Sequence, residues 1–431
     1  MGVLVGMAGL AERLSFMRGN VLVMTICECV WRSTIDIIWP FLSLYVLELG
    51  GSYETIGFIM AVGNLASMIF YPLGGYIADY QGRIKLISYM TFAYGAAFLI
   101  PAFTSTWQWL AVGMFVQSLA TFYFPARQAL IADSIPPEKR GIGFAATAAI
   151  PSAFGIAAPV LGGWLIETLG IGRAMRGLYL SGFFIGVAIA LFRLKFLRET
   201  VENPRSIVFS FNKIPGLVSE SYRSVFTILR EAHKALWTLS LLVSACVLFA
   251  SMVSSFWIVR ASEVIGLSAQ QWGMVMLVSG AVSIALGIPA GSLVDRLSKK
   301  WVAGACLIVG SVQTILFLRC TTFVHVAVLA AFTTLINAFL NPAFQSLFAD
   351  MTPREQRGRV MASIGGGGIW LMRGAWGSGV LGMSMQTLGT FLSGYIYRYD
   401  NSMPWLVLSG GLLILGAMFL VLVQEPEKAE I

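Results

Sequence analysis

Twelve long apolar runs, separated by short polar segments, make up most of the chain. A helix needs about 20 residues to cross a bilayer, and every run reaches that length. Because lipid offers no partner to open backbone groups, we predict that each run is helical. The runs cover roughly residues 20–47, 54–78, 84–104, 107–132, 142–166, 176–197, 234–262, 270–294, 300–320, 324–349, 358–396 and 402–423.

The eleventh run is too long for one straight span. It contains four consecutive glycines at 365–368, then Arg373, then the sequence GAWGSG. These residues interrupt the apolar pattern, so we expect a kinked, broken or partly re-entrant segment.

Composition and charge agree with a membrane protein. The chain has 431 residues, of which 57% are hydrophobic and 12% charged, whereas soluble domains carry about 25% charged residues. A net charge of +8 can indicate nucleic-acid binding, but here the basic residues lie in short loops between apolar runs, which is typical of membrane topology. With the N-terminus in the cytoplasm, Lys and Arg are about four times as frequent inside as outside. We therefore predict a multi-pass protein of the cell (inner) membrane with both termini in the cytoplasm.

The chain also contains an internal repeat. PARQALIADSIPPEKRGIGFA begins at Pro125 and aligns without a gap with PAFQSLFADMTPREQRGRVMA, which begins at Pro342, and 11 of 21 positions are identical. GGYIAD, ending at Asp79, returns in nearly the same register as AGSLVD, ending at Asp295. Repeats of this size are common in secondary transporters.

A long polar segment separates the two copies. It covers residues 198–233, and its later part has apolar residues at helical spacing, which suggests an amphipathic helix on the cytoplasmic leaflet. We predict an N-terminal six-helix bundle at 1–197, this cytoplasmic linker, and a C-terminal six-helix bundle at 234–431. The linker is a tether or, alternatively, a regulatory or partner-binding segment.

The loop after the second run carries the most specific motif. Residues 74–85 read GGYIADYQGRIK, which resembles the signature loop of the major facilitator superfamily, G-x-x-x-D-x-x-G-R-x-[RK]. The matching residues are Gly75, Asp79, Gly82, Arg83 and Lys85. The resemblance covers essentially the whole chain. It implies an all-α polytopic membrane protein with the major facilitator fold, two six-helix bundles related by pseudo-two-fold symmetry.

The resemblance also implies a cytoplasmic gate. In the superfamily this loop latches the cytoplasmic side, and we expect Asp79 and Arg83 to act there with Asp133, at the end of the fourth run. The second copy keeps Gly291 and Asp295 but lacks the Gly-Arg pair; we assign Asp295 to the same gate. The alternative is a loop that only determines topology and folding.

The fifth run resembles the antiporter-associated signature G-P-x-x-G-G. Residues 154–165 read FGIAAPVLGGWL, in which Ala158 replaces the first glycine and Pro159, Gly162 and Gly163 match. Small residues of this kind permit close helix packing and a kink. The fourth run departs from drug antiporters of this type, because it has Gln117 but no Arg before a Gln-Gly pair.

The first run contains Glu28, Arg32 and Asp36, spaced so that all three face roughly the same way. Charges inside a span are costly, and both carboxylates can pair with Arg32. The triad would carry a net charge of −1, which leaves one carboxylate able to take up a proton. We favour Asp36 as the exchangeable, proton-coupling site because it lies nearer mid-membrane. The alternative is a permanent ion-pair ladder.

Polar residues in other runs are candidates for a substrate cavity. Arg127 can pair with Glu28, line an anionic passage, or extend to the interface. For each of the others, hydrogen bonding between helices is the structural alternative. The candidates are Asn64, Gln117, Arg127, Asn337, Asn341, Gln345 and Arg373.

These observations predict a transporter and argue against an enzyme. The two histidines lie in no metal-ligand cluster and no phosphate-binding glycine loop is present, so we expect no cofactor, metal or nucleic-acid partner. We predict a monomer in the lipid bilayer, a proton-coupled antiporter that exports an amphipathic or drug-like organic compound by alternating access. The alternatives are proton-coupled uptake of a small metabolite, sugar or organic anion, a lipid or glycolipid flippase, and a receptor that binds without transport.

Overall fold

The computed structural model describes residues 16–201, 216, 223, 233–352, 368–370, 374–376 and 379–425, and for 71–81, 368–370 and 374–376 it describes the backbone alone. Helices dominate these residues. The first part of the chain forms α2 (Gly19–Ile38), η1 (Trp39–Phe41), α3 (Leu42–Glu48), α4 (Tyr53–Gln81), α5 (Arg83–Ala97), α6 (Leu99–Phe103), α7 (Trp107–Ala120), η2 (Thr121–Tyr123), α8 (Phe124–Ser134), η3 (Pro137–Lys139), α9 (Arg140–Gly155), α10 (Ala158–Leu169) and α11 (Ile171–Phe196).

The second part repeats this organisation. It forms α13 (Lys234–Ser254), α14 (Trp257–Glu263), α15 (Ala269–Val294), α16 (Lys299–Phe317), α17 (Phe323–Asp350), β1 (Gly368–Trp370), β2 (Gly374–Trp376), α19 (Val380–Tyr399) and α20 (Met403–Leu422). Ten helical segments in the described residues are long and apolar enough to cross a membrane. The segments Gly19–Glu48 and Val380–Tyr399 occupy the first and eleventh places of the predicted order.

Several spans are interrupted where the sequence places proline. Pro40 lies in the 3-10 turn η1, and Pro125 and Pro159 stand in the first turns of α8 and α10. Proline fits a first turn because no intrahelical bond is lost there. These interruptions explain why single predicted spans appear as two consecutive helices.

Two helix starts repeat the same cap. The Ser52 side chain accepts from the backbone N–H of Thr55 at the start of α4, and Ser268 accepts from Gln271 at the start of α15. In both, the third helical side chain accepts in return from the cap backbone. Each capping box satisfies two backbone donors that the helix leaves open. The two serines stand in the same register as Asp79 and Asp295, so the cap belongs to the sequence repeat.

The eleventh predicted run, 358–396, is interrupted, as its glycines led us to expect. The described helix is α19, and before it β1 and β2 pair antiparallel with Gly368 opposite Trp376. β1 contacts α17, and β2 contacts α13 and α19. Non-helical backbone at membrane depth is tolerated where protein surrounds it, which is consistent with these contacts.

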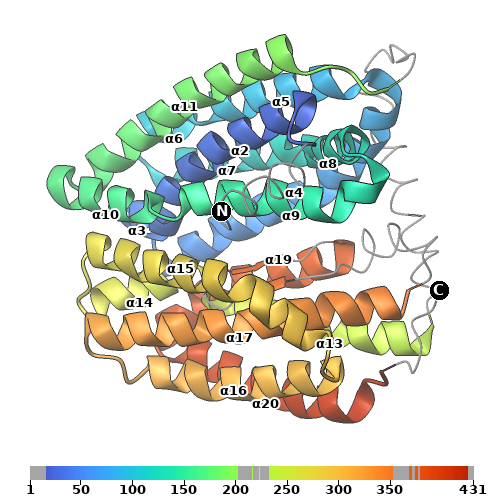
Figure 1. Ribbon diagram of the computed structural model, residues 1–431. Coiled ribbons are helices and arrows are strands. Elements are labelled where there is room, and N and C mark those ends of the chain that lie inside the picture. Colours follow the sequence, from blue (N-terminus) through green and yellow to red (C-terminus); the bar gives the residue numbers. More distant parts are fainter. Residues whose placement is uncertain are drawn as a thin grey trace, which may run out of the picture.

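Figure 1 shows the helices in two groups. The blue-to-green helices α2–α11 form one group, the N group, and the yellow-to-red helices α13–α20 form the other, the C group. We take these groups as the two domains that the sequence predicts. Their contact runs along α4 with α19 and α10 with α15.

Glycine permits the close approach at both crossings. A Cβ on Gly394 of α19 would clash with the backbone of Tyr53 and Glu54, and a Cβ on Gly163 of α10 would clash with the backbone of Ala269. In membranes, where apolar side chains gain little by leaving lipid, helices associate through such small-residue contacts. The two groups therefore meet backbone to backbone.

Side-chain bonds join the groups at the end that the sequence predicts to face outward. The Tyr53 hydroxyl donates to Glu263 Oε2 (2.8 Å), and Arg398 forms an ion pair with Glu54. Ser43 Oγ donates to the Ser255 carbonyl (2.7 Å). These bonds hold the predicted outer ends of the two groups together.

Candidate functional site

Arg32 and Asp36 of α2 form an ion pair, with Arg32 Nε 2.7 Å from Asp36 Oδ2. The side chain of Arg32 is 42% exposed and that of Asp36 is 19% exposed. The end of α9 lies directly against this pair, since a Cβ on Gly155 would be 2.6 Å from Asp36 Oδ2 and 3.1 Å from Arg32 Cγ. Glycine at 155 therefore makes room for the carboxylate.

Glu28 forms ion pairs with arginines of two other helices. The predicted pairing of Glu28 with Arg32 is therefore corrected. Its Oε2 lies 2.5 Å from Arg127 Nη1 of α8, and its Oε1 lies 2.9 Å from Arg193 Nη2 of α11. The prediction that Glu28 and Asp36 share Arg32 counted only the charges on the first span. Of the three roles considered for Arg127, the structure contains the pair with Glu28.

Arg193 is the residue that sequence reasoning missed. Its side chain is 1% exposed, and its Nη1 donates to Thr91 Oγ1 of α5 at 2.6 Å. Arg193 lies near the end of a span, where an arginine is expected to extend its guanidinium to the membrane interface. The signal in the sequence that could have indicated Arg193 is Glu28, two helical turns before Asp36. A buried carboxylate requires a counter-ion of its own, so a further cation on another span could have been expected.

Arg83 forms an ion pair with Asp133, as predicted from the signature loop. Gly82, just before it, has a φ of 86°, a conformation that glycine adopts without strain. Lys85 is exposed. Gly75 and Asp79 lie in the part of α4 for which the backbone alone is described.

The C group has the equivalent ion pair. Lys299 Nζ lies 2.5 Å from Asp350 Oδ2, and these two residues are the repeat equivalents of Arg83 and Asp133. Each pair stays within its own group. Asp295, assigned to the gate, is exposed at the end of α15.

A carboxylate caps the same helix start in each group. Glu199 accepts from the backbone N–H of Ile84 (3.1 Å), and Glu425 accepts from that of Lys299 (3.0 Å) and from Ser298 Oγ (2.6 Å). Burial raises the pKa of each carboxyl, but hydrogen bonds from the backbone, and for Glu425 from Ser298, outweigh it, so both pKa values are below the usual range. The negative charge also suits a helix N-terminus.

The two glycines of the antiporter-like motif contact different groups. A Cβ on Gly162 would lie 2.5 Å from the Ile37 carbonyl of α2, whereas Gly163 lies against α15. The carbonyl of Pro159 in turn leaves no room for a Cβ on Gly273 of α15. This motif therefore joins α10 to the charged helix on one side and to the C group on the other.

The predicted cavity residues differ in burial and in hydrogen bonding. Asn64 Nδ2 lies 3.4 Å from Thr390 Oγ1 of the C group. Gln117 and Asn337 are buried, and each has a side-chain atom without a hydrogen-bond partner among the described residues. Asn341 is buried but Gln345 is exposed, so the three polar residues of α17 do not share one environment. Arg373 lies outside the described residues.

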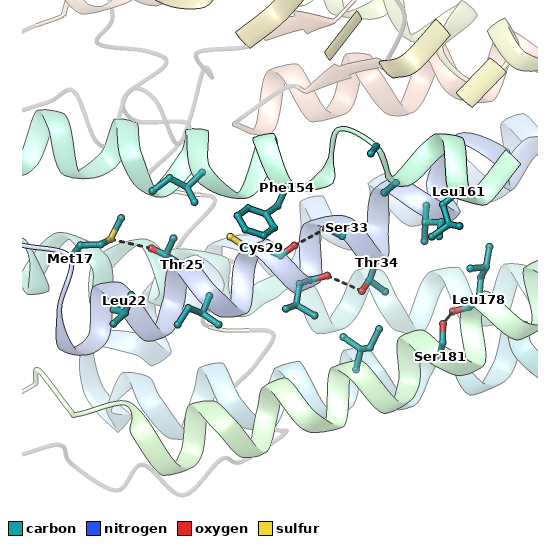
Figure 2. A pocket seen from close by; sticks show the side chains of 17 residues that line it. Met17, Leu22, Thr25, Cys29, Ser33, Thr34, Phe154, Leu161, Leu178 and Ser181 are labelled. Atoms are coloured by element: carbon teal, nitrogen blue, oxygen red, sulfur yellow. Dashed lines mark hydrogen bonds between the residues drawn. The ribbon is translucent and has the colours of Figure 1, made fainter. Parts of the chain in front are cut away.

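A lateral groove runs along a different face of α2. Figure 2 shows it between α2, α9, α10 and α11, and its volume is about 790 Å³. The hydroxyls of Thr25, Ser33 and Thr34 donate to carbonyls of their own helix at 2.7 to 2.9 Å, so the groove offers mainly apolar surface. Phe154 and Leu161 line it and are exposed.

Comparison with known proteins identifies the family. The model of the Major Facilitator Superfamily matches residues 24–368 and 240–430. The chain belongs to this superfamily. It is therefore a multi-pass membrane transporter and not an enzyme, as the sequence predicted.

Curated relatives are named as drug exporters. The chain is 25% identical over 355 residues to the "Multi-drug resistance efflux pump PmrA homolog" of Lactococcus lactis, covering 77% of this chain and 80% of the relative. It is 27% identical over 353 residues to the "Multidrug resistance protein MdtG" of Dickeya zeae, covering 77% and 79%. These names describe the relatives.

Solved structures agree in fold. A point mutant of the nucleoside transporter NupG has a TM-score of 0.69 and 15% identity, covering 94% of this chain and 100% of that one. A bacterial homolog of the human lysosomal transporter Spinster, in an inward-facing conformation, has a TM-score of 0.63 and 15% identity, covering 94% of each chain. The all-α major facilitator fold predicted from the sequence is confirmed.

Proposed function

We propose that the chain is a proton-coupled antiporter that exports an amphipathic or drug-like organic compound by alternating access. The observation that carries the proposal is the Arg32–Asp36 pair inside the first span. The names of the curated relatives support export of this class of compound.

Asp36 is the proton site in this proposal because it has a single ion-pair partner among the described residues. Arg32 is also more exposed than Arg127 and Arg193. Solvent can therefore hydrate the Arg32 guanidinium when Asp36 takes up a proton and its negative charge is lost. Glu28 stays ionised between two guanidiniums. A group that must exchange a proton needs weak counter-ion stabilisation of its charged form.

Alternating access requires one end of the molecule to close while the other opens. We take the bonds that join Tyr53 and Glu54 to Glu263 and Arg398 as the outer gate, closed in this structure. The ion pairs Arg83–Asp133 and Lys299–Asp350 brace the predicted cytoplasmic end of each domain separately. The cytoplasmic orientation of the termini is part of this proposal.

The test is flux in proteoliposomes that contain purified protein. An imposed pH gradient should drive a lipophilic compound across the vesicle membrane against the flow of protons. Asp36→Asn should abolish the gradient-driven component while binding remains. Arg140→Gln, a change in an exposed residue of the predicted cytoplasmic loop, is the control and should retain flux.

Other outcomes would redirect the proposal. Gradient-driven flux of a sugar or organic anion in place of the lipophilic compound would favour uptake, and transfer of a lipid between leaflets would favour a flippase. Binding with no flux would indicate a receptor. Full flux in Asp36→Asn would make the Arg32–Asp36 pair structural.

A further inference from the structure

Ion pairs inside the spans are concentrated in one group of helices. The first span and the helices packed on it hold five ionisable side chains in the N group: Glu28, Arg32, Asp36, Arg127 and Arg193. In the described side chains of the C group, the buried polar groups include the neutral Gln313 and Asn337, and the buried Arg260 of α14 donates to Asn401 without an ion-pair partner among them. Three guanidiniums and two carboxylates leave one positive charge in excess.

The excess belongs to the cluster around Glu28. Arg32 and Asp36 balance each other, whereas Glu28 alone faces two arginines. An uncompensated charge at membrane depth is costly. One more anionic group would therefore neutralise the charge of the cluster formed by the described residues.

The two arginines differ in access. Arg193 is 1% exposed and is held by Glu28 and Thr91, so a ligand cannot reach it. Arg127 is 23% exposed, and its one ion-pair partner among the described residues is Glu28. Its guanidinium stands 5.1 Å from the Phe124 ring centroid, an aromatic surface beside the charge.

The internal repeat places a residue of different chemistry at the position equivalent to Arg127. In the second copy PARQAL becomes PAFQSL, and Phe344 replaces Arg127. Phe344 is fully buried and packs on Phe419 with ring centroids 5.4 Å apart. The same helix position thus holds a core residue in one group and a partly exposed cation in the other.

We infer that Arg127 is a binding site for an anionic group, a carboxylate, sulfonate or phosphate, carried on an apolar cargo. This inference rests on the proposed function, because the cargo is the compound that the protein is proposed to transport. Arg193 is a positioning residue: it holds one oxygen of Glu28, so that Glu28 does not fully neutralise Arg127. The anionic group supplies the missing negative charge, and Phe124 contacts the apolar part.

The experiment compares three fluorescent probes with one ring system: 1-naphthaleneacetate, 1-naphthaleneacetamide and 2-(1-naphthyl)ethylammonium. Binding is measured to the full chain in phosphatidylcholine nanodiscs, without a gradient. The wild type should bind the anion about tenfold more tightly than the amide, the scale of one charge-assisted hydrogen bond. Arg127→Gln should remove this preference and Arg127→Lys should keep part of it.

Two further variants test the charge count. Glu28→Gln removes the competing carboxylate and should increase the preference for the anion. Arg193→Gln leaves Arg127 intact but neutralises the cluster, so the preference should fall. Arg140→Gln is the control and should bind as the wild type, and thermal unfolding identifies any variant that has lost its fold.

Several results would overturn the inference. They are equal binding of the three probes, unchanged preference in Arg127→Gln, and full displacement of 1-naphthaleneacetate by equimolar inorganic phosphate, which would assign the charge to a small counter-ion. Proton-driven export of neutral or cationic compounds alone would refute this site and leave the antiporter standing. Anion preference without gradient-driven flux would refute the antiporter and leave the site.

Discussion

The two groups of helices share their predicted cytoplasmic bracing but differ inside the membrane. Both join a base at the start of one span to an aspartate at the end of the next, Arg83 to Asp133 and Lys299 to Asp350. Both cap that span start with a glutamate. The interior differs: in the N group Arg127 and Arg193 pair with Glu28, and the C group has Phe344 where the N group has Arg127. Duplicated contacts here hold helices in place, and the departures from the repeat carry the candidate chemistry.

The strongest test of this comparison moves the charge into the C group. Phe344→Arg places a guanidinium in the contact with Phe419 without a carboxylate partner. Burying an unpaired charge costs several kcal/mol, so the variant should fail to yield monodisperse protein in size-exclusion chromatography. Phe344→Leu, which only loses volume, should remain folded. Normal yield of Phe344→Arg would mean that this position tolerates charge in both groups.

The next largest effect concerns Glu28, the shared partner of Arg127 and Arg193. Glu28→Gln leaves Arg127 and Arg193 facing each other without an anion, and removing one partner of a buried pair costs about 3–5 kcal/mol. The midpoint of thermal unfolding should therefore fall clearly. The double variant Glu28→Gln with Arg193→Gln should recover part of the loss. Equal midpoints for Glu28→Gln and the wild type would show that solvent already compensates these charges.

The glutamate caps should give a smaller, pH-dependent effect in both groups. The folded-state pKa values of Glu199 and Glu425 are lowered, so their stabilisation is present above the unfolded pKa of about 4.3 and disappears as the pH falls through the folded pKa. Glu199→Gln and Glu425→Gln should each cost about 1 kcal/mol at pH 7.

Thermal unfolding of these two variants, scanned from pH 7 downward, checks the sign. The difference from the wild type should shrink below about pH 4.3. A difference that stays constant over this range would mean that the carboxyls cap as neutral groups. A different pH dependence of unfolding in the two variants would mean that the glutamate caps of the N group and the C group are not equivalent.

The smallest effect is expected at the ion pairs beside the caps. Arg83→Gln and Lys299→Gln remove partly exposed pairs, and such pairs contribute about 0–1 kcal/mol. We therefore expect nearly unchanged unfolding midpoints for both, and reduced flux if the pairs take part in gating. Equal flux in both variants and the wild type would reduce these pairs to structural contacts.

The order and bounds of most spans could be predicted from hydropathy alone, because each helix in lipid satisfies its own backbone. The span predicted at 107–132 corresponds to Trp107–Ser134, and that at 270–294 to Ala269–Val294. For the run at 358–396 the sequence predicted an interruption but not its form, two short strands before α19, because its glycines and aromatic residues give no periodic signal. The pair Arg83–Asp133 was predictable because the signature loop and the end of the fourth run are recognisable.

What the sequence by itself determined is the class of protein, the helices and the repeat, since all of these follow from composition, local pattern and self-similarity. Only the tertiary structure decided which charges meet. Arg193 reaches Glu28 across 165 residues of sequence, and Gly155 makes room for Asp36 from another helix. Such contacts depend on how whole helices pack, and the spacing of residues within one span carries no information about the charges on its neighbours. The assignment of separate roles to Glu28, Asp36 and Arg127 therefore rests on three-dimensional packing.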